Sequence, residues 1–425
     1  MKVLWVSNSP IGPAANILDK TYSGTSGGWI QSEYEFLDKK DLEMSFLCFA
    51  ANISKGDVLE KSNAIGKLYA LKAPRVQNGI IPSAELVKQV QDIISRVSPD
   101  IIHIWGTETC ISNAVSKCSP NIPKVVFIQG LLGIHKRYLG GYFDRKNYAE
   151  YYKGIPFESK LRAWLRAKLF IRQAEIEKDT LNNCKNVIID NDFSEAYCKF
   201  VSPAINCYYR VLEPNAVFEN YKWSLDKANK HQIFTVFAGS AEKGVQQLLF
   251  AIGMLKRKYP DIKVLIPGSY NLSAEHKLIP GNANAYETIL NNIIHKLGID
   301  ENVCFTGRLS PEEMAKHISK AHIFVNPSCM EVHALSLREA MSMGVPCITS
   351  LCGSTGSYVK HEKNGFVYRY EEYEVLAYYI DKLFSNNALS EKISRNALDA
   401  VAEYQNEKKI SLREVYSEML NEWRE

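Results

Sequence analysis

Hydrophobic residues in the first half of the chain fall into short continuous runs, separated by longer stretches of mixed polarity. A run without alternation is typical of a strand in a parallel sheet, because both faces of such a strand are covered. These runs predict strands over residues 2–6, 44–49, 101–106, 125–128, 186–190 and 207–212. Between them, residues 29–37 and 86–97 are predicted to be helical, the second with its apolar side chains on one face.

The second half of the chain shows the same alternation. It predicts strands over residues 234–238, 264–267, 303–306, 323–325 and 345–350, with helices over 245–258, 286–297, 311–320 and 335–343. Strands that alternate with helices are typical of parallel sheets with helices on both faces. We therefore predict an α/β protein of 425 residues with domains over 1–215 and 216–405, followed by a C-terminal helix over 406–425.

One strand–loop–helix–strand unit, residues 322–350, has the composition of a ligand site. Pro327 ends its first strand, and Gly344 and Pro346 end its helix. Glu331 lies in the long loop and Glu339 lies eight residues further on, in the helix. Two carboxylates beside a helix N-terminus suit a ligand with hydroxyl and phosphate groups. The alternative is an ordinary surface loop with two solvated glutamates.

The spacing of these residues resembles the signature of retaining glycosyltransferases of family four. The resemblance rests on Glu331 and Glu339, on Ala340-Met341, and on Gly344-Val345-Pro346. It implies the GT-B fold, in which two Rossmann-like domains face each other across a cleft and the C-terminal helix crosses back to the first domain. Relatives usually have Gly-Phe-Gly where this chain has Val332-His333-Ala334.

The resemblance also implies a donor site for a nucleotide sugar. Glu331 would contact the sugar hydroxyls, Glu339 the ribose, and Lys243 the diphosphate, with Glu331 and Lys243 as the catalytic pair. Ser240 stands where relatives have an arginine that also holds the diphosphate. The predicted donor-binding residues are Gly28, Gly239, Lys243, Arg308, Leu309, Glu331, His333, Ala334, Leu335 and Glu339.

The first domain is expected to bind the acceptor through Trp29, Glu108, Gln129 and His135. Gln129 stands where many relatives have a histidine, and an amide cannot act as a general base. The resemblance therefore favours a retaining mechanism in which the leaving phosphate takes the acceptor proton. The predicted reaction moves a hexosyl group from a nucleotide sugar to a glycan or lipid-linked glycan, with no metal and no other cofactor.

Composition and charge narrow the setting. The ten cysteines show no metal-ligand spacing, and no apolar run approaches the roughly 18 residues of a membrane span. We expect a cytoplasmic protein with reduced thiols. The net charge of +4 is too small to indicate nucleic-acid binding. Residues 136–172, however, hold ten Lys or Arg and three Asp or Glu. This basic segment predicts peripheral contact with an anionic membrane, unless its apolar face packs inside the protein.

Two other functions stay open at this point. Asp190 and Asp192 form a D-x-D pair, which in single-domain GT-A glycosyltransferases binds a divalent cation and the diphosphate. The competing interpretation is a turn in which Asp192 caps the following helix. The second alternative is a non-catalytic GT-B subunit that binds an acceptor or supports a partner enzyme. This alternative is favoured by the departures from the family pattern, which are Ser240, Gln129 and Val332-His333-Ala334. It is opposed by the presence of Lys243, Glu331 and Glu339.

Overall fold

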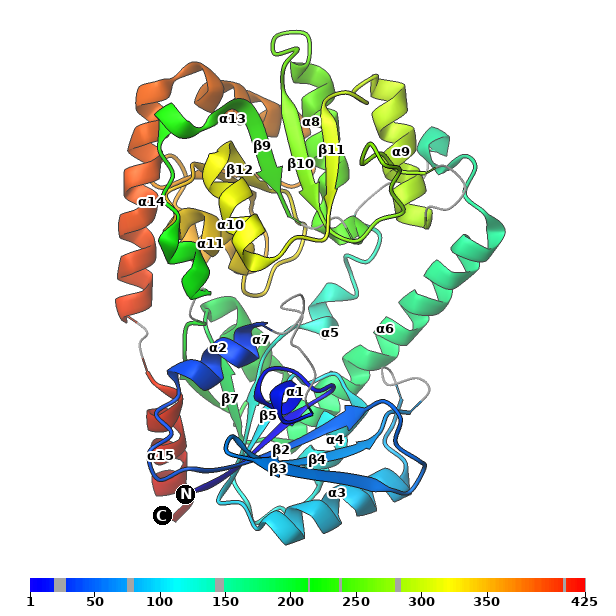
Figure 1. Cartoon of the computed structure of the whole chain (residues 1–425), viewed down its shortest axis with the longest axis vertical. Coiled ribbons are helices and arrows are strands. Elements are labelled where there is room, and N and C mark those ends of the chain that lie inside the picture. The colour runs from blue at the N-terminus through cyan, green and yellow to red at the C-terminus, as the bar shows by residue number, and fades with distance from the viewer. Residues whose placement is uncertain are drawn as a thin grey trace. The chain divides into compact units, whose positions relative to one another are not determined.

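The computed structural model describes residues 1–18, 28–74, 80–141, 149–212, 215–236, 239–279, 284–407 and 410–424. The chain divides into two compact units (Figure 1). Unit 1 comprises Met1–Lys136, Ala167–Glu213 and Lys408–Glu425, and unit 2 comprises Arg137–Arg166 and Pro214–Glu407. The sequence prediction placed single breaks near residues 215 and 405, without the excursion of Arg137–Arg166 into unit 2.

Unit 1 contains an eight-stranded sheet in the order β3-β4-β2-β1-β5-β6-β7-β8. The strands are β1 (Lys2–Ser7), β2 (Glu43–Ala50), β3 (Val58–Asn63), β4 (Gly66–Lys72), β5 (Ile101–Trp105), β6 (Lys124–Phe127), β7 (Asn186–Ile189) and β8 (Asn206–Tyr209). All neighbours are parallel except β3 and β4, which form an antiparallel hairpin at the edge. The expectation of a purely parallel sheet was wrong there, because β3 is a largely exposed strand without an apolar run.

The helices of unit 1 connect these strands. They are α1 (Pro13–Ile17), α2 (Gly28–Phe36), α3 (Ala84–Val97), α4 (Cys110–Lys117), α5 (Leu132–His135), the second half of α6 (Phe157–Asn183), α7 (Asp192–Val201) and the C-terminal α15 (Leu412–Arg424). Tyr416 anchors α15 in the core, where its hydroxyl accepts from Trp5 Nε1 at 2.9 Å and lies 2.6 Å from His103 Nδ1. The predicted return of the C-terminal helix to the first domain is confirmed.

Unit 2 contains a six-stranded parallel sheet in the order β11-β10-β9-β12-β13-β14. The strands are β9 (Asn229–Thr235), β10 (Lys263–Pro267), β11 (Val303–Gly307), β12 (Ala321–Asn326), β13 (Cys347–Ser350) and β14 (Phe366–Tyr368). The helices are α8 (Val245–Leu255), α9 (Ala285–Leu297), α10 (Pro311–Lys320), α11 (Leu335–Ser342), α12 (Thr355–Tyr358), α13 (Tyr373–Ser385) and α14 (Asn387–Glu407). Four short 3₁₀ helices are η1 (Ala149–Tyr152), η2 (Ala216–Asn220), η3 (Leu225–Lys227) and η4 (Ala241–Lys243).

Two hydrophobic clusters cover the faces of this second sheet. One joins the sheet to α8, α9 and α13, and the other joins it to α10, α11 and α14. The excursion of Arg137–Arg166 belongs to the first cluster, because Tyr151 and Ile155 are buried in it. The Asn292 side chain on α9 fixes this segment by donating to the carbonyls of Tyr151 at 2.8 Å and Lys153 at 3.0 Å. Within the described ranges, no helix has the length and apolar character required to cross a membrane.

A buried ion pair ties three segments of unit 1 together. Arg210, after β8, donates from Nε to Glu33 Oε2 at 2.7 Å and from Nη2 to Glu33 Oε1 at 3.1 Å. Its Nη1 donates to the carbonyl of Ile410, before α15, at 2.6 Å. The Glu33 side chain is 0% exposed and that of Arg210 is 8% exposed. Charges this buried are retained only because each satisfies the other.

We predict that Glu33→Ala lowers the free energy of unfolding by about 3–5 kcal/mol, because it leaves the Arg210 charge buried without its carboxylate. Glu60→Ala is the control, since Glu60 forms an exposed pair with Arg96, for which the expected loss is about 1 kcal/mol or less. Thermal and urea denaturation compare the two variants. Equal losses would contradict the assignment of this stability to the buried pair.

Candidate donor and acceptor sites

The strand order of unit 2 brings two distant loops to one edge of the sheet. β9 and β12 are hydrogen-bonded parallel neighbours, so their carboxyl ends lie side by side. The loop after β9 contains Gly239, Ser240 and η4, and the loop after β12 runs from Pro327 to Ala334. In an open α/β sheet this edge is where ligands bind. Phe237 and Ala238, the end of the strand predicted over residues 234–238, lie outside the described residues.

Lys243 and Glu331 meet at this edge. Lys243 Nζ lies 2.8 Å from Glu331 Oε1, which also accepts from Ser328 Oγ at 2.6 Å. The Lys243 side chain remains 31% exposed, and that of Glu331 is 12% exposed. Burial lowers the pKa of Lys243, but the carboxylates of Glu331 and Glu242 outweigh it, so the net pKa is raised. The ammonium group is therefore held in its charged form.

Close backbone approaches fix the two loops against each other. A Cβ on Gly244 would lie 1.8 Å from the carbonyl oxygen of Pro327, and its φ of +70° also favours glycine. The amide of Cys329 donates to the carbonyl of Glu242 at 2.8 Å. On the other side, the Ser354 amide donates to the Glu331 carbonyl at 3.0 Å. The Lys243–Glu331 pair thus stands on a rigid backbone frame.

The two helices that follow these loops, α8 and α11, begin without a side-chain cap from the residue before the helix. The cap residue of α8 is Gly244, with φ +70°, and that of α11 is Ala334, with φ +44°. By contrast, α9 and α10 each begin with a complete capping box. An uncapped helix start presents backbone N–H groups and the positive end of the helix dipole. The two uncapped starts therefore add positive potential beside Lys243, which favours an anionic ligand.

Glu339 is the second carboxylate of the predicted motif. It lies on α11 and is 8% exposed. Burial raises its pKa to about 8, and the nearby Arg338 charge opposes this only in part. At neutral pH much of this carboxyl group is protonated, so it can donate a hydrogen bond as well as accept one.

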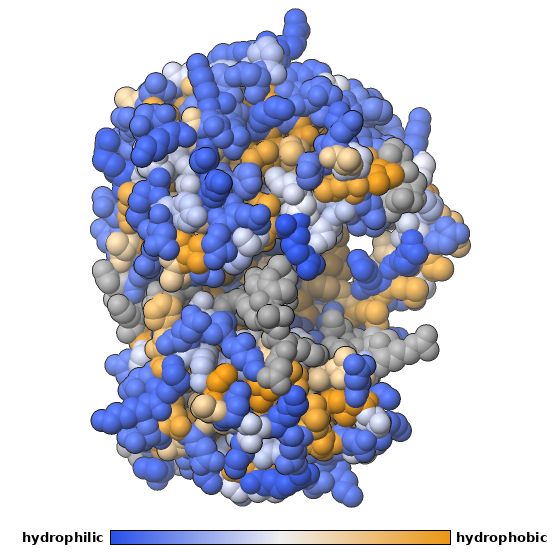
Figure 2. Space-filling view, viewed as in Figure 1, coloured by the Kyte–Doolittle hydropathy of each residue, from blue (hydrophilic) through white to orange (hydrophobic). Residues whose placement is uncertain are grey.

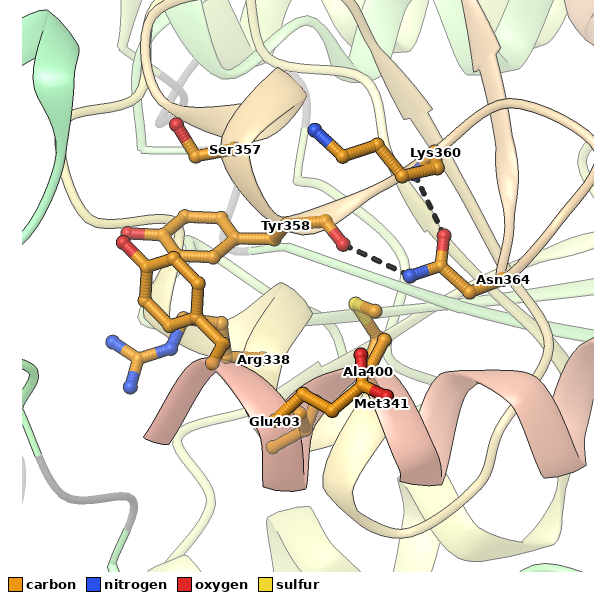
Figure 3. Close-up of a pocket in the computed structure, with 10 residues that line it drawn as sticks. Arg338, Met341, Ser357, Tyr358, Lys360, Asn364, Ala400 and Glu403 are labelled. Atoms are coloured by element: carbon orange, nitrogen blue, oxygen red, sulfur yellow. Dashed lines mark hydrogen bonds between the residues drawn. The ribbon is translucent and has the colours of Figure 1, made fainter. Parts of the chain in front are cut away.

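Arg338, the residue before Glu339 on α11, lines an aromatic pocket of about 210 Å³ (Figure 3). Its guanidinium carbon lies 5.3 Å from the ring centre of Tyr358 and 5.9 Å from that of Tyr404. Asn364 closes the pocket by donating to the Tyr358 carbonyl at 3.0 Å and accepting from the Lys360 amide at 2.7 Å. Cation–π attraction and packing thus hold Arg338 in place on α11, next to Glu339.

The remaining predicted donor residues lie around the same sheet edge. Arg308 and Leu309 follow β11, two strands away from β9, and exposed Arg308 donates to Ser269 Oγ at 3.2 Å. His333 and Leu335 are partly buried beside Ala334 at the start of α11. Gly28 lies outside unit 2, as the first residue of α2. Its neighbours Ser26 and Gly27 lie outside the described residues.

Sequence reasoning missed a segment of unit 2 that packs on the Lys243 turn. A Cβ on Gly141 would lie 2.3 Å from the carbonyl oxygen of Ala241, so the two backbones are in close contact. The Gly141 carbonyl accepts from Tyr370 Oη at 2.7 Å, and Gln246 Nε2 on α8 joins Tyr370 Oη to the Ala241 carbonyl. No local motif marks Gly141, because its partners Ala241 and Tyr370 lie 100 and 229 positions further along the sequence.

The predicted acceptor residues belong to unit 1, and two of them converge. Glu108 and Gln129 flank Gly106, whose φ is +91°. A Cβ there would lie 3.2 Å from Glu108 Oε2 and 3.1 Å from Gln129 Oε1. Burial raises the pKa of Glu108. His135 lies at the end of α5 with its ring 5.2 Å from that of Phe170. Trp29 packs from α2 against the hydrophobic core of this unit.

The D-x-D stretch plays a structural part in unit 1. Asn191 is the cap of α7, since its Oδ1 accepts from the Ser194 amide at 2.9 Å. Asp192 is the first helical residue, which corrects the prediction that Asp192 is the cap, and it accepts from Tyr209 Oη at 3.0 Å. Asp190 is fully buried. Among the described residues, no group of three or more His, Cys, Asp or Glu side chains is placed to hold a metal ion.

Residues 217–399 match the family described as glycosyl transferases group 1. The chain carries a glycosyl transferases group 1 domain. This domain includes β9, β12 and both loops of the Lys243–Glu331 pair. The prediction of a family-four-type glycosyltransferase resemblance is confirmed at this level.

Two similar proteins are named as glycosyltransferases. A putative glycosyltransferase of Bacillus subtilis, YtcC, is 28% identical over 327 residues, which cover 75% of this chain and 72% of that protein. An uncharacterized glycosyltransferase of Methanocaldococcus jannaschii, MJ1607, is 24% identical over 237 residues, covering 53% and 57%. The match thus spans little more than half the length of the second relative.

Solved structures establish the fold around the group 1 domain. Sucrose-phosphate synthase from Thermosynechococcus elongatus has a TM-score of 0.70 at 17% identity, covering 100% of this chain and 98% of that one. Anabaena HepE, solved in complex with UDP and glucose, has a TM-score of 0.63 at 16% identity, covering 98% and 100%. The predicted GT-B fold with two Rossmann-like domains is confirmed. The GT-A alternative, which required a single-domain fold around Asp190 and Asp192, was wrong.

The raised pKa of Glu339 leads to a prediction about how stability depends on pH. Its folded pKa of about 8 lies above the value of about 4.3 in an unfolded chain. Its contribution to stability is therefore complete below about pH 4.3 and is lost as the pH rises through about 8. We expect Glu339→Gln to remove this loss and to raise the melting temperature at pH 9 above that of the wild type.

Glu312→Gln is the matched control, because Glu312 is exposed on α10 of the same unit. Melting temperatures of the three proteins are compared between pH 5 and pH 9. If Glu339→Gln and Glu312→Gln follow the same pH dependence as the wild type, Glu339 does not have the raised pKa.

Proposed function

We propose that this protein transfers a hexosyl group from a nucleotide sugar to a glycan or lipid-linked glycan, with retention at the anomeric carbon and without a metal ion. The 2.8 Å pair of Lys243 and Glu331, inside a glycosyl transferases group 1 domain, is the observation that carries this proposal. The donor class is also supported by Anabaena HepE, a protein of the same fold that was solved with UDP and glucose.

The roles of the two residues follow from charge. A nucleoside diphosphate gains negative charge as it leaves, and a fixed cation stabilises that charge most where water is largely excluded. Lys243 supplies the cation, and the uncapped starts of α8 and α11 supply backbone N–H groups. Glu331 holds Lys243 in place before the donor binds, and then accepts hydrogen bonds from the sugar hydroxyls. Glu339 contacts the ribose of the nucleotide.

The acceptor side favours retention by a front-face route. Gln129 beside Glu108 offers an amide where a general base would otherwise stand. In this route the bond between the anomeric carbon and the diphosphate oxygen breaks, and the acceptor oxygen bonds to the same face of the sugar. The acceptor proton passes to the departing phosphate oxygen. No protein base has to take that proton.

Two measurements separate this proposal from its rivals. Thermal-shift screening with UDP-, GDP- and dTDP-sugars should show stabilisation by at least one donor, whereas a subunit that has lost its donor site would show none. Transfer that persists in EDTA supports the metal-independent mechanism. Transfer that stops in EDTA and returns with Mg²⁺ or Mn²⁺ contradicts it.

We predict that Lys243→Ala lowers turnover by a hundredfold or more, since removal of one positioned charge stabiliser typically costs about 3–4 kcal/mol of barrier. Lys392→Ala, at an exposed position on α14, should leave turnover unchanged. Product formation at saturating donor is the measurement, with melting temperatures to show that both variants are folded. Near-wild-type turnover in folded Lys243→Ala would remove the proposed role.

Helix α6 presents an exposed apolar surface that fits the membrane contact predicted for the basic segment. Five apolar side chains on this helix are 44–74% exposed. At 3.6 residues per turn they fall on one side of the helix, opposite to buried Ser159 and Glu177. Hydrophobic and hydrophilic surfaces accordingly lie side by side along α6 (Figures 1 and 2). The five residues are Phe157, Leu161, Trp164, Leu165 and Ile171.

Charge on the same helix fits an anionic lipid surface. Residues 157–172 contain five Lys or Arg and one Glu. The packed alternative predicted that these apolar side chains would be covered, but they are exposed in the structure. A helix with an apolar face and basic flanks binds in the interface of an anionic membrane. We propose that α6 holds the enzyme on the cytoplasmic face of a membrane that carries its lipid-linked acceptor.

We predict that Lys160→Glu/Arg172→Glu, which changes the two exposed basic residues beside the apolar face, and Leu161→Ser/Leu165→Ser each lower binding to vesicles of phosphatidylglycerol and phosphatidylcholine at least tenfold. One basic residue near an anionic surface contributes about 1 kcal/mol, and each buried leucine contributes at least as much. Sedimentation with vesicles measures the bound fraction. The wild type should bind little to vesicles of phosphatidylcholine alone.

Two controls match these changes elsewhere on the surface. Lys392→Glu/Arg395→Glu alters the net charge by the same amount on α14, and Phe200→Ser removes an apolar side chain that is 86% exposed on α7. Both should bind vesicles like the wild type. Equal losses in controls and α6 variants would mean that net charge or stability, rather than α6, governs binding.

A further inference from the structure

Glu177, in the unit 1 half of α6, is a buried carboxylate that the proposed chemistry has not used. It is 0% exposed. Its Oε2 accepts from the amide of Leu132 at 2.8 Å and from Thr107 Oγ1 at 3.3 Å. Its Oε1 accepts from the amide of Gly133 at 2.9 Å and from Tyr197 Oη at 2.6 Å. Four donors from three other segments thus converge on one carboxylate.

Two of these donors are the first amides of α5. The residue before α5, Leu131, has no side chain that can cap the helix, so Glu177 provides the missing acceptors from 44 residues away. α5 ends at His135 and follows Gln129 after β6, and both were predicted to face the acceptor. Glu177 therefore fixes the backbone of the loop over residues 129–135.

The close packing around this carboxylate leaves no room for a looser arrangement. A Cβ on Gly133 would lie 1.9 Å from Tyr197 Oη. Thr107 Oγ1, which lies 3.3 Å from Glu177 Oε2, also lies 3.4 Å from Glu108 Oε2. A threonine hydroxyl has one proton, so it can donate to only one of the two carboxylates at a time. The loop and the Glu108 side chain thus share one network.

We propose that Glu177 is a positioning residue for the acceptor. Its ionised carboxylate holds the loop over residues 129–135 in the conformation that receives the acceptor hydroxyl. This inference rests on the proposed glycosyl transfer and on the assignment of the acceptor to unit 1.

The protonation state of Glu177 decides whether this clamp forms. Burial raises its pKa to about 7, the hydrogen bonds from Tyr197, Gly133 and Leu132 oppose the rise, and the Glu108 charge adds to it. The titratable groups that face it are Glu108, after β5, and Tyr197 and Cys198, on α7. Protonation turns one carboxylate oxygen into a hydroxyl group, which is a weaker acceptor and brings a proton of its own among the four donors. The clamp should therefore weaken as the pH falls through about 7.

The stability of the fold depends on the protonation of Glu177 in the opposite direction to the clamp. The folded pKa of Glu177 lies above that of an unfolded glutamate, so its contribution to stability is complete below about pH 4.3 and lost as the pH rises through about 7. Ionisation of Glu177 thus forms the clamp but lowers the free energy of unfolding.

The test begins with Glu177→Gln, which preserves the shape of the side chain and removes one acceptor oxygen. We expect the KM for the acceptor to rise between tenfold and a hundredfold, the usual effect of losing a hydrogen bond to a charged group. Donor affinity and kcat should change less than threefold. Hydrogen exchange of the peptide that contains Leu132 and Gly133 should become faster. Glu158→Gln, the same substitution at an exposed position on α6, should change none of these.

Tyr197→Phe provides a second variant with a different signature. It removes a donor that stabilises the ionised form, so the pKa of Glu177 rises further. The acidic limb of the pH profile of kcat/KM for the acceptor should then move to higher pH. In wild-type protein without substrates, protection of the Leu132 and Gly133 amides should fall as the pH is lowered through about 7.

The outcomes distinguish failure of the positioning role of Glu177 from failure of the proposed glycosyl transfer. If the wild type transfers sugar but Glu177→Gln keeps its acceptor KM, or Tyr197→Phe keeps the pH profile, the positioning role is overturned. If no donor is bound or transferred by the wild type, the proposed function fails and the acceptor role fails with it. In that case pH-dependent amide protection would show a clamp that serves only the fold.

Discussion

The adjacency of β9 and β12 in a parallel sheet is the constraint on which the donor site depends. Lys243 and Glu331 are 88 residues apart, yet both follow strands that end at the same edge, in neighbouring positions. The sheet brings their loops within reach, and glycines let the loops touch. Gly244 admits the carbonyl of Pro327, and Gly353 admits that of Glu331. The ion pair is therefore a product of sheet topology, and its side chains need no independent attraction to meet.

Glu331, Glu339 and Glu177 are three largely or fully buried carboxyl groups, and each has a different set of partners. Glu331 has a cation, Lys243, and a hydroxyl, Ser328, as partners. Glu177 has backbone amides and hydroxyls, which keep its pKa near 7 despite complete burial. For Glu339, burial raises the pKa to about 8, and the Arg338 charge is the main influence that opposes this rise. The stronger the set of fixed donors around a carboxyl, the more of its charge survives burial, as expected from the cost of desolvation.

Sequence reasoning found those features whose signal is local. Continuous apolar runs predicted the central strands of both sheets, and the two βα series predicted two domains. The family resemblance assigned Lys243 and Glu331 to one donor site, and their direct contact came only from the structure. It failed where the signal is distant. The edge strand β3 has no apolar run, and the segment containing Tyr151 and Ile155 packs in a core whose other buried residues begin at Ile233, far along the sequence. Glu177 belongs to the same class, because nothing near it in the sequence points to α5.

The loop that departs most from the family pattern also shows how sequence and site are related. Val332 and Ala334, which stand in place of two glycines, are buried, so the fold has absorbed their side chains. Ala334 nevertheless keeps a left-handed φ of +44°, a conformation that costs a non-glycine residue about 1 kcal/mol or more. Alanine also has no side-chain acceptor, so the first amides of α11 are left without a cap from this residue. A residue able to cap the helix would satisfy one of these amides and would weaken the positive potential at the start of α11.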